Sequence, residues 1–265
     1  MTRVFPELRW HFDSTDHPVA AEVAHWFEDV RDFDLVPLSD DPRLTADIHA
    51  HMPILKHDAE VLHRRWMPPL PFYDECYDLD ILIRQVNADL FTTLPEVQGV
   101  HGRYTSGGRP MILLLCAVSD PQRLSATLIH EFGHHLKYMN GPSKDGFPMA
   151  NWLLEEILAE QLVADCCGFT YLTHNKSCPP QAKETVHRFL IEEEDRDNLD
   201  LYDEIVDFTD SRDSGLHCYA LANELIRLQR WTFAELLKMN DRAFRAALLE
   251  STDLWTDQGD AGEVS

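Results

Sequence analysis

Residues 121–140 carry a regular pattern of apolar positions along the chain. Four apolar side chains recur every four residues: Leu124, Leu128, Phe132 and Leu136. This spacing places them on one face of a helix. Asp120 supplies an N-cap, Pro121 suits the first helical position, and Gly141 supplies a C-terminal stop. The pattern therefore predicts a helix over residues 121–140 with one face turned to the core.

The segments on either side of this helix predict a small sheet and a second long helix. Residues 97–105 and 109–118 are typical of strands, and Ser106-Gly107-Gly108 between them predicts a hairpin turn. The second strand does not alternate, so both of its faces should be covered. Residues 150–172 are apolar almost all round, which predicts a buried helix.

The first 95 residues show helical patterns and predict an N-terminal helical lobe. Apolar residues in residues 18–33 recur near helical spacing. Pro53 is expected to start a separate helix over residues 54–66. Residues 78–90 are also predicted to be helical.

Helical patterns continue toward the end of the chain, over residues 181–195, 216–230 and 232–249, and a polar tail follows over residues 251–265. The predicted fold class is therefore α+β and mostly helical. Its predicted parts are the helical lobe over residues 1–95, a core containing the sheet over residues 96–175, a helical continuation over residues 176–250, and the tail.

The net charge of the chain limits the kinds of molecule that it is expected to bind. The chain has 265 residues and a formal charge of −23 with histidine neutral. Such a field disfavours nucleic acid and anionic lipid and favours basic peptides or proteins; the oligomeric state is left open. No apolar leader segment or membrane span is visible, which predicts a cytoplasmic protein, although export by a signal-independent route would look the same. The six cysteines show no CxxC spacing, so reduced thiols are expected.

The chemistry-bearing motif lies inside the first helix, in the string His130-Glu131-Phe132-Gly133-His134. Histidines four residues apart project from the same face of a helix, so both imidazoles can reach one metal ion. Glu131 lies beside that face and can take a proton from an attacking water.

The second helix carries carboxylates in an apolar setting. Glu156 and Glu160 lie within about 40° of each other around the helix axis, whereas Glu155 lies about 100° from Glu156. Buried carboxylates one turn apart repel unless a cation or a donor stands between them. A metal ion and a metal-bound histidine are plausible occupants of that position.

These two helices resemble the zincin metallopeptidases, whose HExxH helix follows a strand that aligns the substrate, here residues 109–118. The metzincin branch does not fit, because its extended motif would fall on Lys137 and Asn140. The gluzincin branch takes its third ligand from a glutamate on a later helix. The string Glu156-Ile-Leu-Ala-Glu160 also resembles the ExxAE segment of anthrax lethal factor, a gluzincin-like toxin protease.

The resemblance implies a zincin-like catalytic core and a zinc-dependent peptidase with one zinc per chain. His130, His134 and Glu156 would hold the metal, and Glu131 would act as general base. Glu160 would orient a ligand histidine, with Glu160 as ligand the open alternative. His217 and Tyr219 are candidate donors to the oxyanion of the transition state. His135 is expected to point away from the metal, toward solvent or a supporting position.

Two other classes of function stay open. The first is an acidic binding or decoy protein with a purely structural zinc. The second is a hydrolase of the same fold that cleaves a non-peptide amide. An alignment on Ala164-Asp165-Cys-Cys-Gly168 would instead place the ligand at Gln161, a poor zinc ligand.

Three further features have plainer interpretations. The histidines at positions 49, 51, 57 and 63 fit no single helical face and are expected to be surface or core residues. The acidic stretch over residues 192–213 is expected to be a solvated face, or a rim that attracts basic peptides. Cys166 and Cys167 are expected to be core thiols.

Overall fold

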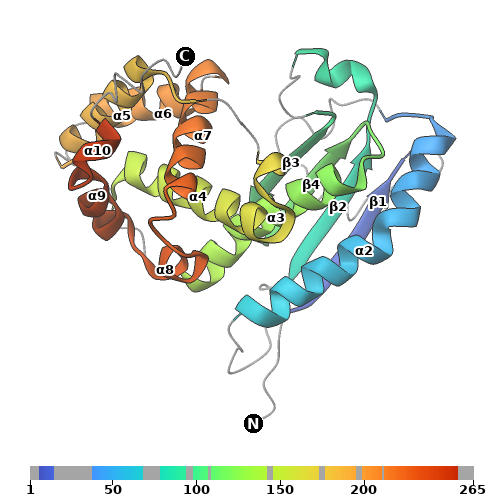
Figure 1. Cartoon of the computed structure of the whole chain (residues 1–265). Helices are drawn as coiled ribbons and strands as arrows, with labels where there is room; N and C mark the ends of the chain where they lie inside the picture. The colour runs from blue at the N-terminus through green and yellow to red at the C-terminus, as the bar shows by residue number, and fades with distance from the viewer. Residues whose placement is uncertain are drawn as a thin grey trace, which may run out of the picture. The chain divides into compact units, whose positions relative to one another are not determined.

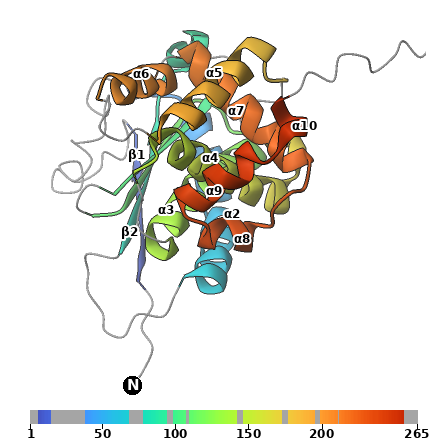
Figure 2. The same cartoon turned by 90° about the vertical axis from the view of Figure 1, so that its left-hand side faces the viewer.

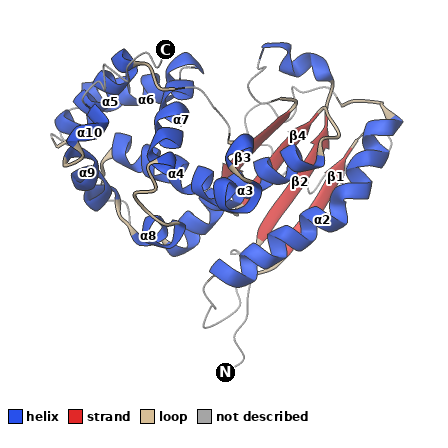
Figure 3. Cartoon of the chain, viewed as in Figure 1, coloured by secondary structure: helices blue, strands red, loops and turns tan. Residues whose placement is uncertain are grey.

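The structure is a computed structural model that describes residues 6–14, 38–67, 78–93, 98–106, 109–141, 146–172, 177–194, 199–210 and 212–255. It is mostly helical with a small mixed sheet, which confirms the α+β class (Figure 3). The chain divides into two compact units. Unit 1 comprises Met1–Asn140 and Leu162–Thr173, and unit 2 comprises Gly141–Gln161 and His174–Ser265.

Unit 1 is built on a sheet whose strand order is β1-β2-β4-β3 (Figure 1). Strands β1 (Leu8–Asp13), β2 (Leu79–Gln85) and β4 (Met111–Cys116) run parallel, and β3 (Val100–Thr105) pairs antiparallel with β4. The two strands predicted on either side of residues 106–108 are therefore confirmed. β4 is paired on both sides, so it has no free edge for a substrate, and the expectation that residues 109–118 align one is wrong. In the described part of the sheet, β3 is the edge strand beside β4.

The prediction of a purely helical segment over residues 1–95 is wrong. β1 and β2 belong to the same sheet as β4, and residues 78–90 form β2 and the start of a 3-10 helix, η2 (Ala88–Thr93). Every residue of β2 is buried, and a short apolar run of this kind has the same pattern whether it is strand or helix. The predicted helix over residues 18–33 lies outside the described residues.

The charged residues of β2 are accommodated by ion pairs, which a sequence pattern does not show. Asp80 lies 2.9 Å from His11 Nε2 and 2.6 Å from Arg109 Nε. The Arg84 guanidinium donates to the buried Asp13 carboxylate of β1. Because these partners come from strand β1 and from the segment just before β4, the charges can be buried in the sheet.

Helices α2 (Pro42–Trp66) and α3 (Pro121–Asn140) cover one face of the sheet (Figures 1 and 2). α2 is continuous, so the break predicted at Pro53 is wrong. Pro53 is exposed, and so is His49, the residue whose carbonyl loses its helical hydrogen bond to a proline at this position. α3 has the predicted bounds, and Asp120 Oδ1 accepts hydrogen bonds from the amides of Gln122 and Arg123.

The second long helix, α4 (Pro148–Cys167), is shorter at its C-terminal end than predicted. Gly168 follows it with a φ of 89°, a left-handed value that favours glycine and stops the helix. A 3-10 turn, η4 (Phe169–Tyr171), completes the segment.

Unit 2 also contains helices α5 (Pro180–Glu192), α6 (Leu199–Asp210), α7 (Arg212–Arg227), α8 (Phe233–Lys238), α9 (Asp241–Leu249) and α10 (Thr252–Trp255) (Figure 2). α5 and α7 match the predicted helices. The single helix predicted over residues 232–249 is two helices, because Asn240 caps α9 by accepting from the Ala243 amide. The polar tail begins with α10, and its residues 256–265 lie outside the described part.

The acidic stretch contains α6, whose acidic residues Asp200, Asp203 and Glu204 are exposed, as expected of a solvated face. The apolar residues Leu201 and Ile205 of the same helix are buried. No helix in the described part of the chain combines the length and the apolar character needed to cross a membrane.

Candidate metal centre

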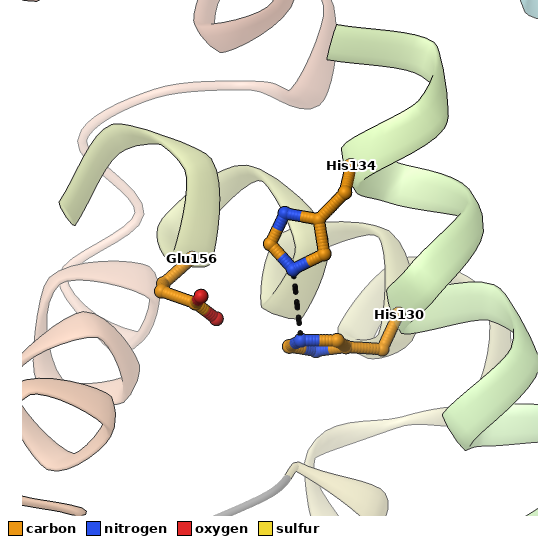
Figure 4. A group of neighbouring side chains, drawn as sticks. All are labelled: His130, His134 and Glu156. Carbon is orange, nitrogen blue, oxygen red and sulfur yellow. Dashed lines mark hydrogen bonds between the residues drawn. The ribbon is translucent and has the colours of Figure 1, made fainter. Parts of the chain in front are cut away.

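Two histidines of α3, His130 and His134, bring their imidazole rings together. His130 is buried and His134 is half-buried, and their Nε2 atoms lie 3.2 Å apart (Figure 4). The spacing suits a hydrogen bond from one imidazole to the other. It also matches two zinc ligands, because Zn–N bonds of about 2.0–2.1 Å at a tetrahedral angle put the nitrogens about 3.3 Å apart.

Glu156 of α4 completes a group of three possible ligands. One ligand atom from each of His130, His134 and Glu156 lies within 4.8 Å of the other two. Glu156 is 7% exposed, and its carboxylate points toward the imidazoles in Figure 4. The cluster could therefore hold a metal ion. Two imidazoles and a carboxylate are the donor set of catalytic zinc sites that keep one position open.

Glu131, the residue after His130, is buried against strand β3. A Cβ atom added to Gly102 would lie 2.5 Å from Glu131 Oε1 and 2.6 Å from its Cγ. The glycine therefore leaves the space that the Glu131 side chain occupies. The sequence analysis did not single out Gly102, although a glycine inside a strand often marks a close approach of this kind.

Gly102→Ala should displace the Glu131 carboxylate, because the new methyl group would occupy its space. Any reaction that uses Glu131 should then slow by about 100-fold, since misplacements of about 1 Å can cost this much. Arg43→Ala, on an exposed position of α2, is the control and should change activity little. Steady-state kinetics and thermal melting of both variants check this result. Equal activity of Gly102→Ala and the control would show that the contact with Glu131 does not matter.

The other predicted site residues lie outside the three-residue cluster. Glu160 is fully buried one turn after Glu156 on α4. The Tyr219 ring of α7 packs edge-on against Trp152, with the centroids 5.6 Å apart, and Trp152 lies one turn before Glu156. His217 is half-buried on α7. The roles proposed for these three residues stay predictions.

Cys218, between the last two of these residues, is a feature that the sequence analysis missed. Burial raises the pKa of its thiol, and the charges of Cys178 and Glu156 raise it further. The thiol is therefore protonated and inert at neutral pH. Its interaction with Glu156 indicates that α7 presents Cys218 toward the part of α4 that carries this carboxylate.

His135 is fully buried, so the expectation of solvent contact is wrong. Its Nδ1 lies 3.5 Å from the Tyr104 hydroxyl of β3, and its ring packs edge-on against Phe132. Burial lowers the His135 pKa to about 3, with a smaller contribution from His63. His135 is therefore a neutral core residue of unit 1.

The prediction for the histidines of α2 is confirmed, and the prediction for the adjacent cysteines of α4 is wrong. The histidines of α2 are surface or core residues as expected: His63 is buried, and burial lowers its pKa to about 4, whereas His49 and His57 are exposed. Cys166 is exposed and Cys167 half-buried, so the prediction of core thiols is wrong. Both lie in the last turn of α4.

Comparisons with known proteins found no match to the chain. No protein-family model, no curated protein and no solved structure matches the chain. The functional interpretation therefore depends on the motif in α3, the cluster that it forms with Glu156, and the strand beside Glu131.

Proposed function

We propose that the protein is a zinc-dependent metallopeptidase. The observation that carries this proposal is the cluster of His130, His134 and Glu156, with ligand atoms within 4.8 Å of one another and Glu131 adjacent in the sequence. These three residues would hold one zinc ion per chain. When bound, zinc supplies a Lewis acid that polarises a carbonyl and lowers the pKa of water.

Glu131 would act as the general base. Its buried position beside the metal ligands excludes bulk water, and an ionised carboxylate there can accept a proton from the attacking water. The same carboxyl group can then deliver this proton to the leaving amine. Glu160 would orient a ligand histidine, and His217 or Tyr219 would donate a hydrogen bond to the oxyanion.

Strand β3 supports a peptide as substrate. It is an edge strand of the described sheet, and it lies along α3 with Gly102 against Glu131. An extended peptide can add to such an edge through its backbone hydrogen bonds. The charge of −23 favours basic peptides, since an acidic surface attracts cations.

The number of ligands distinguishes catalysis from a structural zinc. Structural zinc sites are closed by four protein ligands, whereas the group found among the described residues offers three. This difference favours catalysis over the acidic decoy. Cleavage of a non-peptide amide would use the same residues, so an experiment must distinguish it from peptide cleavage.

Digestion of a peptide mixture by the native protein tests the function. We expect cleavage, preferentially of basic peptides, that stops with a chelator and returns when zinc is added. His57→Ala, on an exposed α2 position, should cleave like the wild type, and His134→Ala should not. A zinc-loaded wild type that cleaves small amides but no peptide would support the non-peptide alternative, and one that cleaves neither would support the decoy.

A further inference from the structure

The first turn of α4 is held by carboxylates that come from distant parts of unit 2. A helix leaves its first N–H groups without partners, and the residue before it usually supplies an acceptor from its side chain. Here that residue is Phe147, which has none. Glu193 Oε2 instead accepts from the Met149 amide at 2.9 Å and from the Ala150 amide at 3.4 Å.

Asp241, the first residue of α9, supports the same helix start. Its Oδ2 atom accepts from the Phe147 amide at 3.2 Å. Glu193 and Asp241 therefore place two carboxylates beside the positive end of the α4 dipole. Of the two, Glu193 contacts the helix amides themselves.

Glu193 is almost completely withdrawn from water, since its side chain is 1% exposed. The charged groups that face it come from α9: Arg245, whose Nε lies 3.8 Å from Glu193 Oε1, and Asp241. Arg245 is already engaged, because its Nε donates to the Leu190 carbonyl at 2.6 Å and its Nη1 lies 2.5 Å from Glu194. At 3.8 Å the Arg245 contact is not a hydrogen bond.

The surroundings of Glu193 therefore favour its neutral form. Burial raises the pKa of the Glu193 carboxyl to about 7, against the lowering effect of the Met149 and Ala150 amides and of Arg245. Asp241 adds a small increase. Burial disfavours the ionised form of a carboxyl group, so the group either keeps its proton or gains by becoming hydrated.

We propose that Glu193 is a proton-operated latch on the first turn of α4. Protonated, the side chain stays buried and accepts from the two amides. Ionised, it moves to water, and the first turn of α4 opens locally. Because Glu156 follows Met149 on α4 by two turns, the latch acts on the helix that carries the third metal-cluster residue. The latch needs no bound metal and does not depend on the proposed hydrolysis.

The direction of the pH dependence follows from the two protonation states. The closed state holds its proton up to about pH 7, whereas the open, hydrated carboxyl loses it above about 4.5. The closed latch is therefore fully stable below pH 4.5 and loses stability as the pH rises through 7. Between pH 5 and pH 7 the opening constant should rise about 40-fold, which is the ratio given by these two pKa values.

Amide hydrogen exchange in the full-length protein measures this opening. Protection of the Met149 and Ala150 amides, corrected for intrinsic exchange rates, should fall about 40-fold from pH 5 to pH 7 in the wild type. In Glu193→Gln the acceptor oxygen remains but cannot ionise, so protection should be independent of pH. Glu192→Gln, an exposed neighbour paired with Arg188, should behave like the wild type.

If the protection of the Met149 and Ala150 amides depends on pH equally in the wild type and in Glu193→Gln, the proposal is overturned. An effect of pH on metal binding would appear in both proteins, so it cannot produce a difference between them. A titration of the wild-type Glu193 side-chain carboxyl carbon by NMR needs no variant. A midpoint clearly above 4.5 supports the latch, and a midpoint near 4.5 overturns it.

Discussion

Glu131→Gln is expected to abolish hydrolysis while leaving zinc bound. The substitution keeps the shape of a side chain that is buried against Gly102 and removes its ability to take a proton. Loss of a general base costs about 10²- to 10⁴-fold in rate. Zinc should stay, since Glu131 is not one of the three residues of the cluster. Steady-state hydrolysis and metal analysis on the same preparation give both quantities.

Glu155→Gln is the matched control for this result. Glu155 is the neighbour of Glu156 on α4, is half-buried, and accepts from the Asn151 side chain at 3.2 Å. Its neutralisation should leave both the rate and the zinc content near the wild-type values. A Glu131→Gln enzyme that retains wild-type activity would contradict the role of Glu131 as base, and one that loses zinc would make Glu131 a ligand.

Glu156→Ala should prevent zinc binding, and Glu160→Ala should only weaken it. The Glu156 carboxylate lies within 4.8 Å of ligand atoms of both histidines, whereas Glu160 is one turn further along α4 and outside that group. Loss of a residue that supports a ligand lowers metal affinity or activity by about 10- to 100-fold. Zinc titration against a competing chelator measures both variants.

The opposite result would exchange the roles of Glu156 and Glu160. If Glu160→Ala is the variant that cannot hold zinc and Glu156→Ala still does, Glu160 is the ligand. Circular dichroism at equal concentration checks that both variants are folded. This control is needed because both side chains are buried and either substitution leaves a cavity.

The predictable parts of the fold are those whose signals are local. The bounds of α3 follow from Asp120, Pro121 and Gly141, and the pair of histidines follows from their spacing inside this helix. A buried, acid-bearing α4 follows from its composition. Each of these features depends on a few consecutive residues.

The features that were not predictable depend on partners far away in the sequence. β2 pairs with strands on both sides, and its Asp80 and Arg84 contact His11, Arg109 and Asp13. Glu193 lies in an acidic stretch, yet its place is set by the amides of α4, more than forty residues earlier. No pattern within either segment shows these contacts.

Metal analysis of the purified wild-type protein shows whether His130, His134 and Glu156 hold a zinc ion. We predict about one zinc per chain, and none in His130→Ala, because that substitution removes one of three donors whose ligand atoms lie within 4.8 Å of one another. A correctly folded wild type that contains no zinc, and takes up none when zinc is added, would contradict the account.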